Sequence, residues 1–178
     1  AAKQITFASS AESFDSFALA RDGTIVFTVV EERFVHLYSM ALDGSGRRRL
    51  TTGPGLNQAP CIARNLHVVV FTAFRADGLP HLWRMDLDGG NQAQVTQGAG
   101  EFLIDVDPNG LSAVYARSDS MPSLWRIALS GGTPAHVITP ASLDFYIGFS
   151  PDGQRFAYTC FREEGGRIFE DIAVIPAA

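Results

Sequence analysis

The side chains best suited to chemistry in this sequence are acidic and amide groups that recur every 43 or 44 residues. Asn57, Glu101 and Asp144 hold equivalent positions, Phe14 stands at the first such position, and Asp15 lies beside it. Carboxylate and amide oxygens that converge on one point could bind a hard cation or a cationic side chain. The sequence therefore predicts a ligand-binding channel mouth at these five residues. The alternative is a set of hydrated loop ends around a water-filled channel.

Residue types used in catalysis are present, but without the spacing that catalysis needs. Ser150 lies in a Gly-Phe-Ser-Pro-Asp sequence, which lacks the second glycine of a nucleophile elbow. The histidines have no His-x-x-x-His spacing and no nearby cysteine pair, so we expect no zinc site at His36, His67, His81 or His136. Phosphate-binding loops and protein-kinase catalytic motifs are also absent from the sequence. We therefore expect no enzyme active site, no metal site and no cofactor in this chain.

These residues keep a common register because the chain is a repeat. Four turn dipeptides are separated by 43, 44 and 43 residues: Asp22-Gly23, Asn65-Leu66, Asn109-Gly110 and Asp152-Gly153. A Leu-Trp-Arg motif, or a variant of it, starts at Leu37, Leu82 and Leu124, with a looser copy over residues 171–175. A fixed period in the forties is typical of propellers and other repeat arrays.

Each repeat has the pattern of four short antiparallel strands joined by tight turns. In residues 57–100, β-branched and aromatic runs are separated by Asp-Gly turns, a strong hairpin signal. Stacking such sheets around an axis buries their faces and protects their edges. We therefore expect an all-β fold, a β-propeller of four-stranded antiparallel blades with about four repeats. One propeller domain or propeller fragment would fill residues 1–178, with blades at about 9–52, 53–97, 98–140 and 141–178.

The N-terminal residues 4–7 share the pattern of the predicted outer strands, which include Leu50-Thr51, Val95-Thr96 and Ile138-Thr139. Because the fourth repeat ends before an outer strand of its own, residues 4–7 could supply that strand and close the ring. They could equally cap a preceding blade. Four repeats could form a compact ring, half of a ring made by two chains, or part of a longer propeller.

Two further sets of residues recur with the repeat. Trp83 and Trp125 occupy one register, and we expect them to pack between blades. Arginine and acidic residues recur after the second strand of each repeat, where we expect local ion pairs: Glu32 with Arg33, Arg75 with Asp77, Arg117 with Asp119, and Arg162 with Glu163.

Composition limits the classes of partner. The 178 residues include 46% hydrophobic and 19% charged side chains, within the globular range. The net charge of −5 disfavours a nucleic-acid-binding or anionic-membrane-binding surface, and no apolar run is long enough to span a bilayer. Cys61 and Cys160 fall in non-adjacent repeats, so we expect free thiols. The chain begins without methionine, and we expect a mature form or a segment excised from a larger protein.

Residues 149–158, Phe-Ser-Pro-Asp-Gly-Gln-Arg-Phe-Ala-Tyr, closely resemble the Ser-Pro-Asp-Gly hairpin of the TolB-like (WD-repeat-like) propeller repeat. Residues 82–90 resemble the second half of that repeat. The resemblance covers residues 4–178, although the first three turns depart from Ser-Pro-Asp-Gly and Asn65-Leu66 lacks its glycine. It implies a β-propeller. Relatives include periplasmic binding proteins, the propellers of prolyl-oligopeptidase-like peptidases, and sensor-like regions of bacterial receptor Ser/Thr kinases.

The Leu-Trp-Arg motif followed by Gly-Gly is most similar to the receptor-kinase group. We therefore expect a non-catalytic binding or sensor module excised from a larger bacterial protein such as a receptor Ser/Thr kinase. The alternatives are the substrate-gating propeller of a prolyl-oligopeptidase-like peptidase and a stand-alone periplasmic TolB-like protein-binding propeller. We expect a protein or small-molecule ligand, no nucleic acid and no membrane contact by this segment, with a homodimer as an open alternative. The expected location is extracytoplasmic, either periplasmic or at the cell surface of a bacterium.

Overall fold

The fold is built from β-strands alone over the described part of the chain, which confirms the prediction of an all-β fold. A computed structural model describes residues 3–6, 12–63, 67–117, 123–139 and 146–177, and these ranges contain no helix. The described residues therefore include no helix that is long and apolar enough to cross a membrane.

The strands follow one another in four sets, here called modules 1 to 4. Module 1 contains β1 (Glu12–Leu19), β2 (Ile25–Glu31), β3 (Phe34–Met40) and β4 (Arg48–Arg49). Module 2 contains β5 (Leu56–Ala63), β6 (Val68–Phe74), β7 (Pro80–Asp86) and β8 (Ala93–Gln94). Module 3 contains β9 (Glu101–Val106), β10 (Ser112–Arg117), β11 (Ser123–Ala128) and β12 (Ala135–Ile138). Module 4 contains β13 (Ile147–Phe149), β14 (Arg155–Glu164) and β15 (Arg167–Pro176).

Neighbouring strands within each module pair antiparallel, and the tight turns between them explain the repeated Asp-Gly dipeptides. In module 1 the Asp22 carboxylate accepts a hydrogen bond from the Thr24 backbone N–H at 2.8 Å. Gly23 follows with φ of +89°, a conformation that side-chain-bearing residues rarely adopt. The corresponding Asn65-Leu66 turn lies outside the described residues.

The first strand of modules 1, 2 and 3 carries a pairing irregularity at a similar place. The register with the neighbouring strand shifts between Phe14 and Phe17 in β1, and between Gln58 and Cys61 in β5. The β9–β10 pair shifts between Val114 and Ala116 on β10. Such bulges bend a strand and increase its twist, so these strands curve as they cross the molecule.

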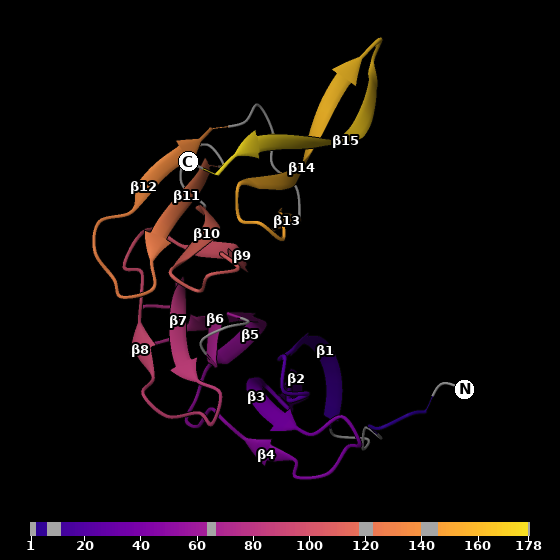
Figure 1. Cartoon of the computed structure of the whole chain (residues 1–178), viewed down its shortest axis with the longest axis vertical. Helices are drawn as coiled ribbons and strands as arrows, with labels where there is room; N and C mark the ends of the chain where they lie inside the picture. Colours follow the sequence, from indigo (N-terminus) through magenta and orange to yellow (C-terminus); the bar gives the residue numbers. More distant parts are fainter. Residues whose placement is uncertain (1–2, 7–11, 64–66, 118–122, 140–145, 178) are drawn as a thin grey trace.

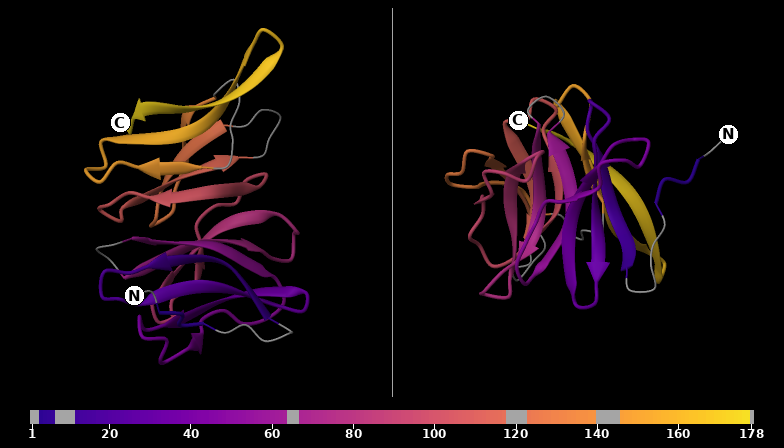
Figure 2. Two further views of the ribbon diagram at one scale, coloured as in Figure 1. Left: turned by 90° about the vertical axis from the view of Figure 1, so that its right-hand side faces the viewer. Right: turned by 90° about the horizontal axis from the view of Figure 1, so that it is seen from below.

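The four modules form an open arc rather than a compact closed ring (Figure 1). The first strand of each module, β1, β5, β9 or β13, lies toward the open side of the arc, and the two chain ends lie on different end modules. Views at right angles show the sheets stacked face to face in sequence order (Figure 2). Modules 1 and 2 are also joined by one parallel bridge, between Val35 and Leu56.

Among the described residues, hydrophobic clusters lie at the three junctions between consecutive modules, and a further cluster lies on the outer face of module 1. Leu37, Leu82 and Leu124 hold one register position in the third strands, and each is 0% exposed. Each of them packs in the cluster that joins its own module to the next. Fully burying a leucine side chain contributes about 2 kcal/mol, so stacking of the modules is the main source of stability.

The N-terminal segment does not form the predicted outer strand over its described part. Residues 3–6 carry no strand, and Ile5 packs against the outer face of module 1. The segment therefore lies on the first module and not beside β15 of the last one. Module 4 has three strands in the described part of the chain.

Candidate functional site

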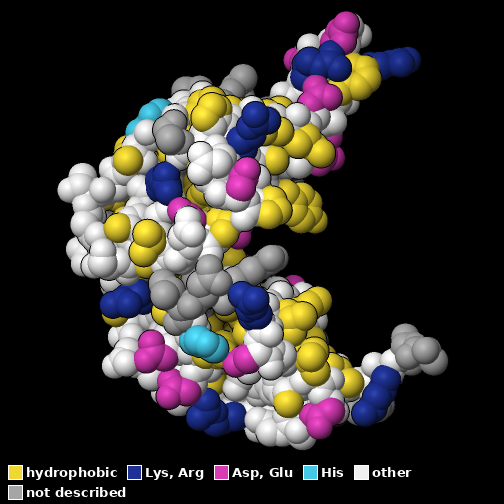
Figure 3. Space-filling view, in the orientation of Figure 1, with side chains coloured by type: hydrophobic (Ala, Val, Ile, Leu, Met, Phe, Trp, Pro, Cys, Tyr) yellow, Lys and Arg dark blue, Asp and Glu magenta, His cyan; other side chains and the backbone are white. Residues whose placement is uncertain are grey.

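The candidate functional site is a groove on the open side of the arc, here called the inner groove. A cavity of about 330 Å³ lies there, and it is lined from the first strands of all four modules. Its walls include Phe17, Leu19, Cys61, Asp105, Phe149 and Pro151. The space-filling view shows a hollow on this side, bordered by apolar side chains (Figure 3).

Two apolar side chains of β1 are exposed in the inner groove, where a ligand could contact them. Phe17 is 75% exposed and Leu19 is 53% exposed. Single exposed apolar residues are common on soluble proteins, but apolar side chains gathered in a concave site are typical of binding pockets. The groove therefore offers an apolar wall for contact.

Asp105 ties three of the first strands together at the floor of the inner groove. Its Oδ2 accepts a hydrogen bond from the Phe149 backbone N–H at 2.6 Å, and its Oδ1 accepts one from the Val106 N–H at 2.8 Å. The Cys61 thiol donates to Oδ1 at 3.3 Å. These contacts hold β5, β9 and β13 in a fixed arrangement, so the groove floor is preorganised.

The Cys61 thiol in the groove wall is poorly suited to act as a nucleophile. Burial, and then the negative charge of Asp105, raise the pKa of Cys61 to about 12. The reactive thiolate form is therefore scarce at neutral pH. Cys61 and Cys160 are both free, as the sequence predicted.

Glu101, one of the predicted mouth residues, lies in a buried polar network between modules 2 and 3. Its Oε2 lies 2.7 Å from His81 Nδ1 and accepts a hydrogen bond from the Thr96 hydroxyl at 2.8 Å. The other imidazole nitrogen, Nε2, lies 2.7 Å from Asp77 Oδ2. Glu101 is 1% exposed and His81 is 3% exposed. Since a carboxylate only accepts, this geometry fits an imidazole that donates from both nitrogens, which is the protonated form.

Asn57, a second predicted mouth residue, lies at the corresponding junction between modules 1 and 2. Its amide Nδ2 donates to the Val35 carbonyl at 2.9 Å, and the side chain is fully buried. Beside it, the Thr51 hydroxyl accepts a hydrogen bond from the Leu37 backbone N–H at 2.9 Å and lies 3.4 Å from His36 Nδ1. Thr96 makes the equivalent contact to the Leu82 N–H in the next module.

The two junctions shift the pKa values of their histidines in opposite directions. Burial, followed by the positive charge of Arg49, lowers the pKa of His36. Burial also opposes the charged form of His81, but hydrogen bonds to Glu101 and Asp77 outweigh it and raise the pKa of His81. We therefore expect a neutral imidazole at the first junction and a protonated one at the second.

The remaining predicted mouth residues are placed differently. Phe14 packs edge-to-face against Phe27 at a ring distance of 5.8 Å on the outer face of module 1, and Asp15 lines a cavity on that face. Asp144 lies outside the described residues. The channel-mouth role of the five residues therefore stays a prediction.

Two of the expected local ion pairs, Arg75 with Asp77 and Arg162 with Glu163, are replaced by other contacts. Arg75 lies over the Trp83 ring at 4.9 Å, while Asp77 contacts His81. Arg162 pairs with Glu164 and Asp171 rather than with Glu163. Arg117 lies 4.5 Å from the Trp125 ring centre, and Asp119 lies outside the described residues.

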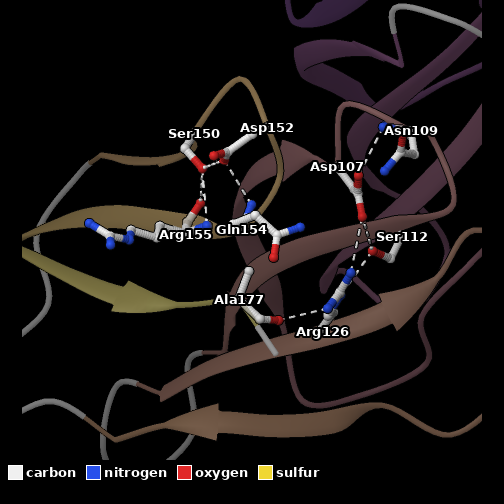
Figure 4. Close-up of polar contacts among 9 residues, drawn as sticks. All are labelled: Asp107, Asn109, Ser112, Arg126, Ser150, Asp152, Gln154, Arg155 and Ala177. Carbon is white, nitrogen blue, oxygen red and sulfur yellow. Dashed lines mark hydrogen bonds and ion pairs between the residues drawn. The ribbon is translucent and has the colours of Figure 1, made fainter.

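Ser150 serves the turn that its motif predicts. Its hydroxyl donates to Asp152 Oδ1 at 2.5 Å and accepts from the Arg155 backbone N–H at 3.0 Å (Figure 4). The turn closes through a hydrogen bond from the Gly153 N–H to the Ser150 carbonyl at 2.8 Å. The hydroxyl is therefore engaged in local structure.

Arg126 joins module 3 to the end of module 4 beside that turn (Figure 4). Its guanidinium donates to Asp107 Oδ2 at 3.0 Å, to the Ser112 hydroxyl at 2.9 Å and to the Ala177 carbonyl at 2.7 Å.

Among the described residues, no group of three or more His, Cys, Asp or Glu side chains is arranged to hold a metal ion.

Sequence reasoning missed Asp105 and the paired threonines. Thr51 and Thr96 were visible as repeated residues of the outer-strand pattern, so their common register could have indicated a shared contact. Asp105 has no counterpart in the repeat motifs, and its role depends on strands that are distant in sequence.

Comparison with known proteins gives a family and a fold. The sequence profile of the family described as Dipeptidyl peptidase IV (DPP IV) N-terminal region matches residues 56–164. No curated protein matches the sequence at a significant level.

Several solved structures resemble the fold at low sequence identity. TolB from Agrobacterium tumefaciens is 17% identical with a TM-score of 0.75, over 90% of this chain and 60% of that one. The tricorn protease is 16% identical with a TM-score of 0.71, over 96% of this chain and 17% of that one. A puromycin hydrolase mutant is 15% identical with a TM-score of 0.70, over 90% of this chain and 26% of that one. The chain thus spans 60% or less of these relatives, and the likeness shows an all-β, propeller-like fold.

Proposed function

The chain belongs to the family of dipeptidyl peptidase IV N-terminal regions, and we propose that it is a non-catalytic binding module that recognises a ligand in its inner groove. Each module would be one propeller blade, with the predicted boundaries at 9–52, 53–97, 98–140 and 141–178. The ligand would be a protein segment or a small molecule with apolar groups.

The observation that supports this proposal most strongly is the composition of the groove wall. Side chains from the first strands of all four modules line one cavity, and Phe17 and Leu19 are exposed there. Asp105 fixes three of these strands relative to one another. A rigid scaffold that presents apolar side chains in a concave site loses little entropy on binding.

A peptide array tests this function directly. The 178-residue chain is applied to immobilised short peptides of varied sequence, alongside Leu19→Lys and a control, Leu42→Lys. The two leucines are 53% and 57% exposed, but only Leu19 lines the inner groove. We expect Leu19→Lys to abolish binding to the peptides that wild type selects, while Leu42→Lys retains it.

Two results would contradict the proposal. One is equal binding by both variants, which would place recognition elsewhere on the surface. The other is cleavage of any bound peptide by the purified chain alone, which mass spectrometry of the array eluate would detect.

The setting of the module in a longer protein is a further proposal. The family match, together with the likeness to propellers in the tricorn protease and a puromycin hydrolase, supports a substrate-gating role beside a peptidase domain. The receptor Ser/Thr kinase setting is supported by the motif over residues 82–90, and a stand-alone TolB-like role is supported by the fold likeness to TolB. In each setting we propose an extracytoplasmic location in a bacterium. The parent gene distinguishes them, since it encodes a hydrolase domain, a kinase domain or neither.

A further inference from the structure

The first junction, between modules 1 and 2, is covered closely by a loop of module 2. This loop joins β7 to β8 and packs against Leu50, which follows β4. A Cβ atom at Gly89 would lie only 3.1 Å from the Leu50 carbonyl oxygen. The Gln92 side-chain Nε2 donates to that same oxygen at 3.0 Å and to the Gly89 carbonyl at 3.1 Å. The Gln92 carboxamide therefore bridges the loop and the strand of the preceding module.

At the second junction, between modules 2 and 3, the equivalent loop makes no such bridge. Strand pairing and turn hydrogen bonds give three pairs of equivalent residues: Leu50 and Val95, Gly89 and Gly131, and Gln92 and Pro134. A Cβ atom at Gly131 would meet no described atom beyond its chain neighbours within 4 Å. Because proline has no side-chain donor, Pro134 cannot supply the hydrogen bonds that Gln92 makes.

A cavity of about 470 Å³ lies at the second junction, here called the junction cavity. Its lining includes residues 94–98 of module 2, Gly131 and Pro134 of the loop, and Glu101, Tyr115 and Arg117 of module 3. This volume is within the range of about 300 to 1,000 Å³ that is typical of small-molecule sites. The junction cavity shares no lining residue with the inner groove.

The module 3 wall of the junction cavity is more polar than the equivalent wall of module 2 at the first junction. The strand register gives three equivalent pairs: Asn57 and Glu101, Phe71 and Tyr115, and Ala73 and Arg117. Two apolar residues are thus replaced by a phenol and a guanidinium at the junction where the loop bridge is missing. Burial, followed by the negative charge of Glu101, raises the pKa of Tyr115 to about 12, so its hydroxyl is protonated at neutral pH.

We propose that the junction cavity binds a small ligand of the glutamine type, whose carboxamide takes the place of the Gln92 side chain and whose carboxylate contacts Arg117. The first junction shows which group fits between this loop and this strand. At the second junction the carboxamide of the ligand would donate to the Val95 carbonyl, as Gln92 donates to the Leu50 carbonyl.

Arg117 is placed to bind the other end of such a ligand. Its guanidinium lies 4.5 Å from the centre of the Trp125 ring. Ile127, which lines the cavity nearer the loop, follows Trp125 by two residues on β11, a rise of about 7 Å. An extended glutamine molecule spans a similar distance from its carboxamide to its carboxylate. A guanidinium has five N–H donors and pairs well with carboxylates, so Arg117 can add this contact to those it makes within the chain.

Isothermal titration calorimetry of the 178-residue chain with L-glutamine and L-glutamate tests the proposal. Two variants accompany the wild type. Pro134→Gln puts the equivalent of Gln92 into the junction cavity, whereas Thr133→Gln adds the same side chain at an exposed neighbour that does not line it. Circular dichroism verifies that both variants remain folded.

We expect wild type and Thr133→Gln to bind glutamine equally, and Pro134→Gln to bind it at least about 10-fold more weakly, because its own side chain occupies the site. Glutamate should bind wild type about 10-fold more weakly than glutamine, because its side-chain carboxylate cannot donate to a carbonyl. A wild type that does not bind glutamine would overturn the proposal. Equal affinity for glutamate would overturn the carboxamide assignment, and unchanged binding by Pro134→Gln would overturn the location.

Discussion

The first and second junctions use one backbone plan with different electrostatics. At both, a threonine hydroxyl accepts a hydrogen bond from the N–H of a buried leucine, and a histidine of the third strand lies beside it. The next module contributes Asn57 at the first junction and Glu101 at the second. The repeat therefore fixes the positions of the contacts, and the residue at one position decides whether the junction is neutral or charged.

This difference matters because the two polar networks depend on pH in opposite ways. The pKa of His36 is lowered, which favours the neutral imidazole, and its junction is held by contacts to backbone groups and to Thr51. His81, whose pKa is raised, lies between two carboxylates, one buried and one half exposed. A buried ion pair contributes little net stability, but removal of one partner leaves an unpaired charge and is costly.

The largest expected effect is the loss of Glu101. Glu101→Ala removes a buried carboxylate from His81 and Thr96, and we expect it to lower the free energy of unfolding by about 3 kcal/mol. Asn57→Ala removes one hydrogen bond to a carbonyl and should cost about 1 kcal/mol. Urea denaturation of both variants measures the comparison. Equal losses would mean that the charge at the second junction has no special role.

A smaller contrast is expected between the two threonines. Thr96→Val removes two hydrogen bonds, one of them to a carboxylate, and should cost about 2 kcal/mol, while Thr51→Val should cost about 1 kcal/mol. Valine keeps the shape of threonine, so packing changes little. Thermal unfolding followed by circular dichroism would show the order of the two losses. A greater loss for Thr51→Val would contradict the comparison.

The pH dependence of stability should differ between variants of the two histidines. His81 has a folded pKa above its usual value of 6.5, so its stabilisation is complete below that pH and is lost as pH rises through the folded pKa. His36 has a lowered pKa, so its contribution is complete above 6.5 and is lost as pH falls through the folded pKa. The wild-type chain should therefore lose stability as pH rises above 6.5, and His81→Gln should abolish this loss. It should also gain stability as pH rises toward 6.5 from below, and His36→Gln should abolish this gain. Identical profiles for the two variants would rule out this assignment.

The smallest effect is expected for Asp77→Asn. The Asp77 carboxylate is half exposed, and solvent screens its contact with His81. We expect a lower pKa for His81 with no clear change in the urea midpoint. A large loss of stability would mean that Asp77, rather than Glu101, is the main partner of His81.

Local patterns in the sequence were sufficient to predict the strands and their stacking. The Asp-Gly turns and the apolar runs around Leu82 and Leu124 depend on neighbouring residues, so they are readable from the chain itself. The N-terminal segment was not predictable in this way, because Ile5 is held by side chains of module 1 and not by strand pairing. The sequence left a compact ring, half of a ring made by two chains and part of a longer propeller as alternatives, because the angle between modules depends on packing at the junctions. The open arc argues against the compact ring (Figure 1).

The prediction of the site had a similar limit. The register placed Asn57 and Glu101 at equivalent positions, and the structure places both at successive junctions. Their burial could not be predicted, because the alternation of side chains along a strand does not show which neighbouring module covers them. The inner groove depends on Asp105, which joins strands more than 40 residues apart in sequence.

The central claim is that the repeat fixes the contacts at the first and second junctions, while one residue at each sets the charge. An NMR titration of the His36 and His81 imidazole rings tests this claim most directly. The account predicts that the pKa of His81 lies above the usual imidazole value of 6.5 and that the pKa of His36 lies below it. It also predicts that Glu101→Gln lowers the pKa of His81 and leaves the pKa of His36 unchanged. Titration of His36 and His81 at the same pH in the wild-type chain would contradict it.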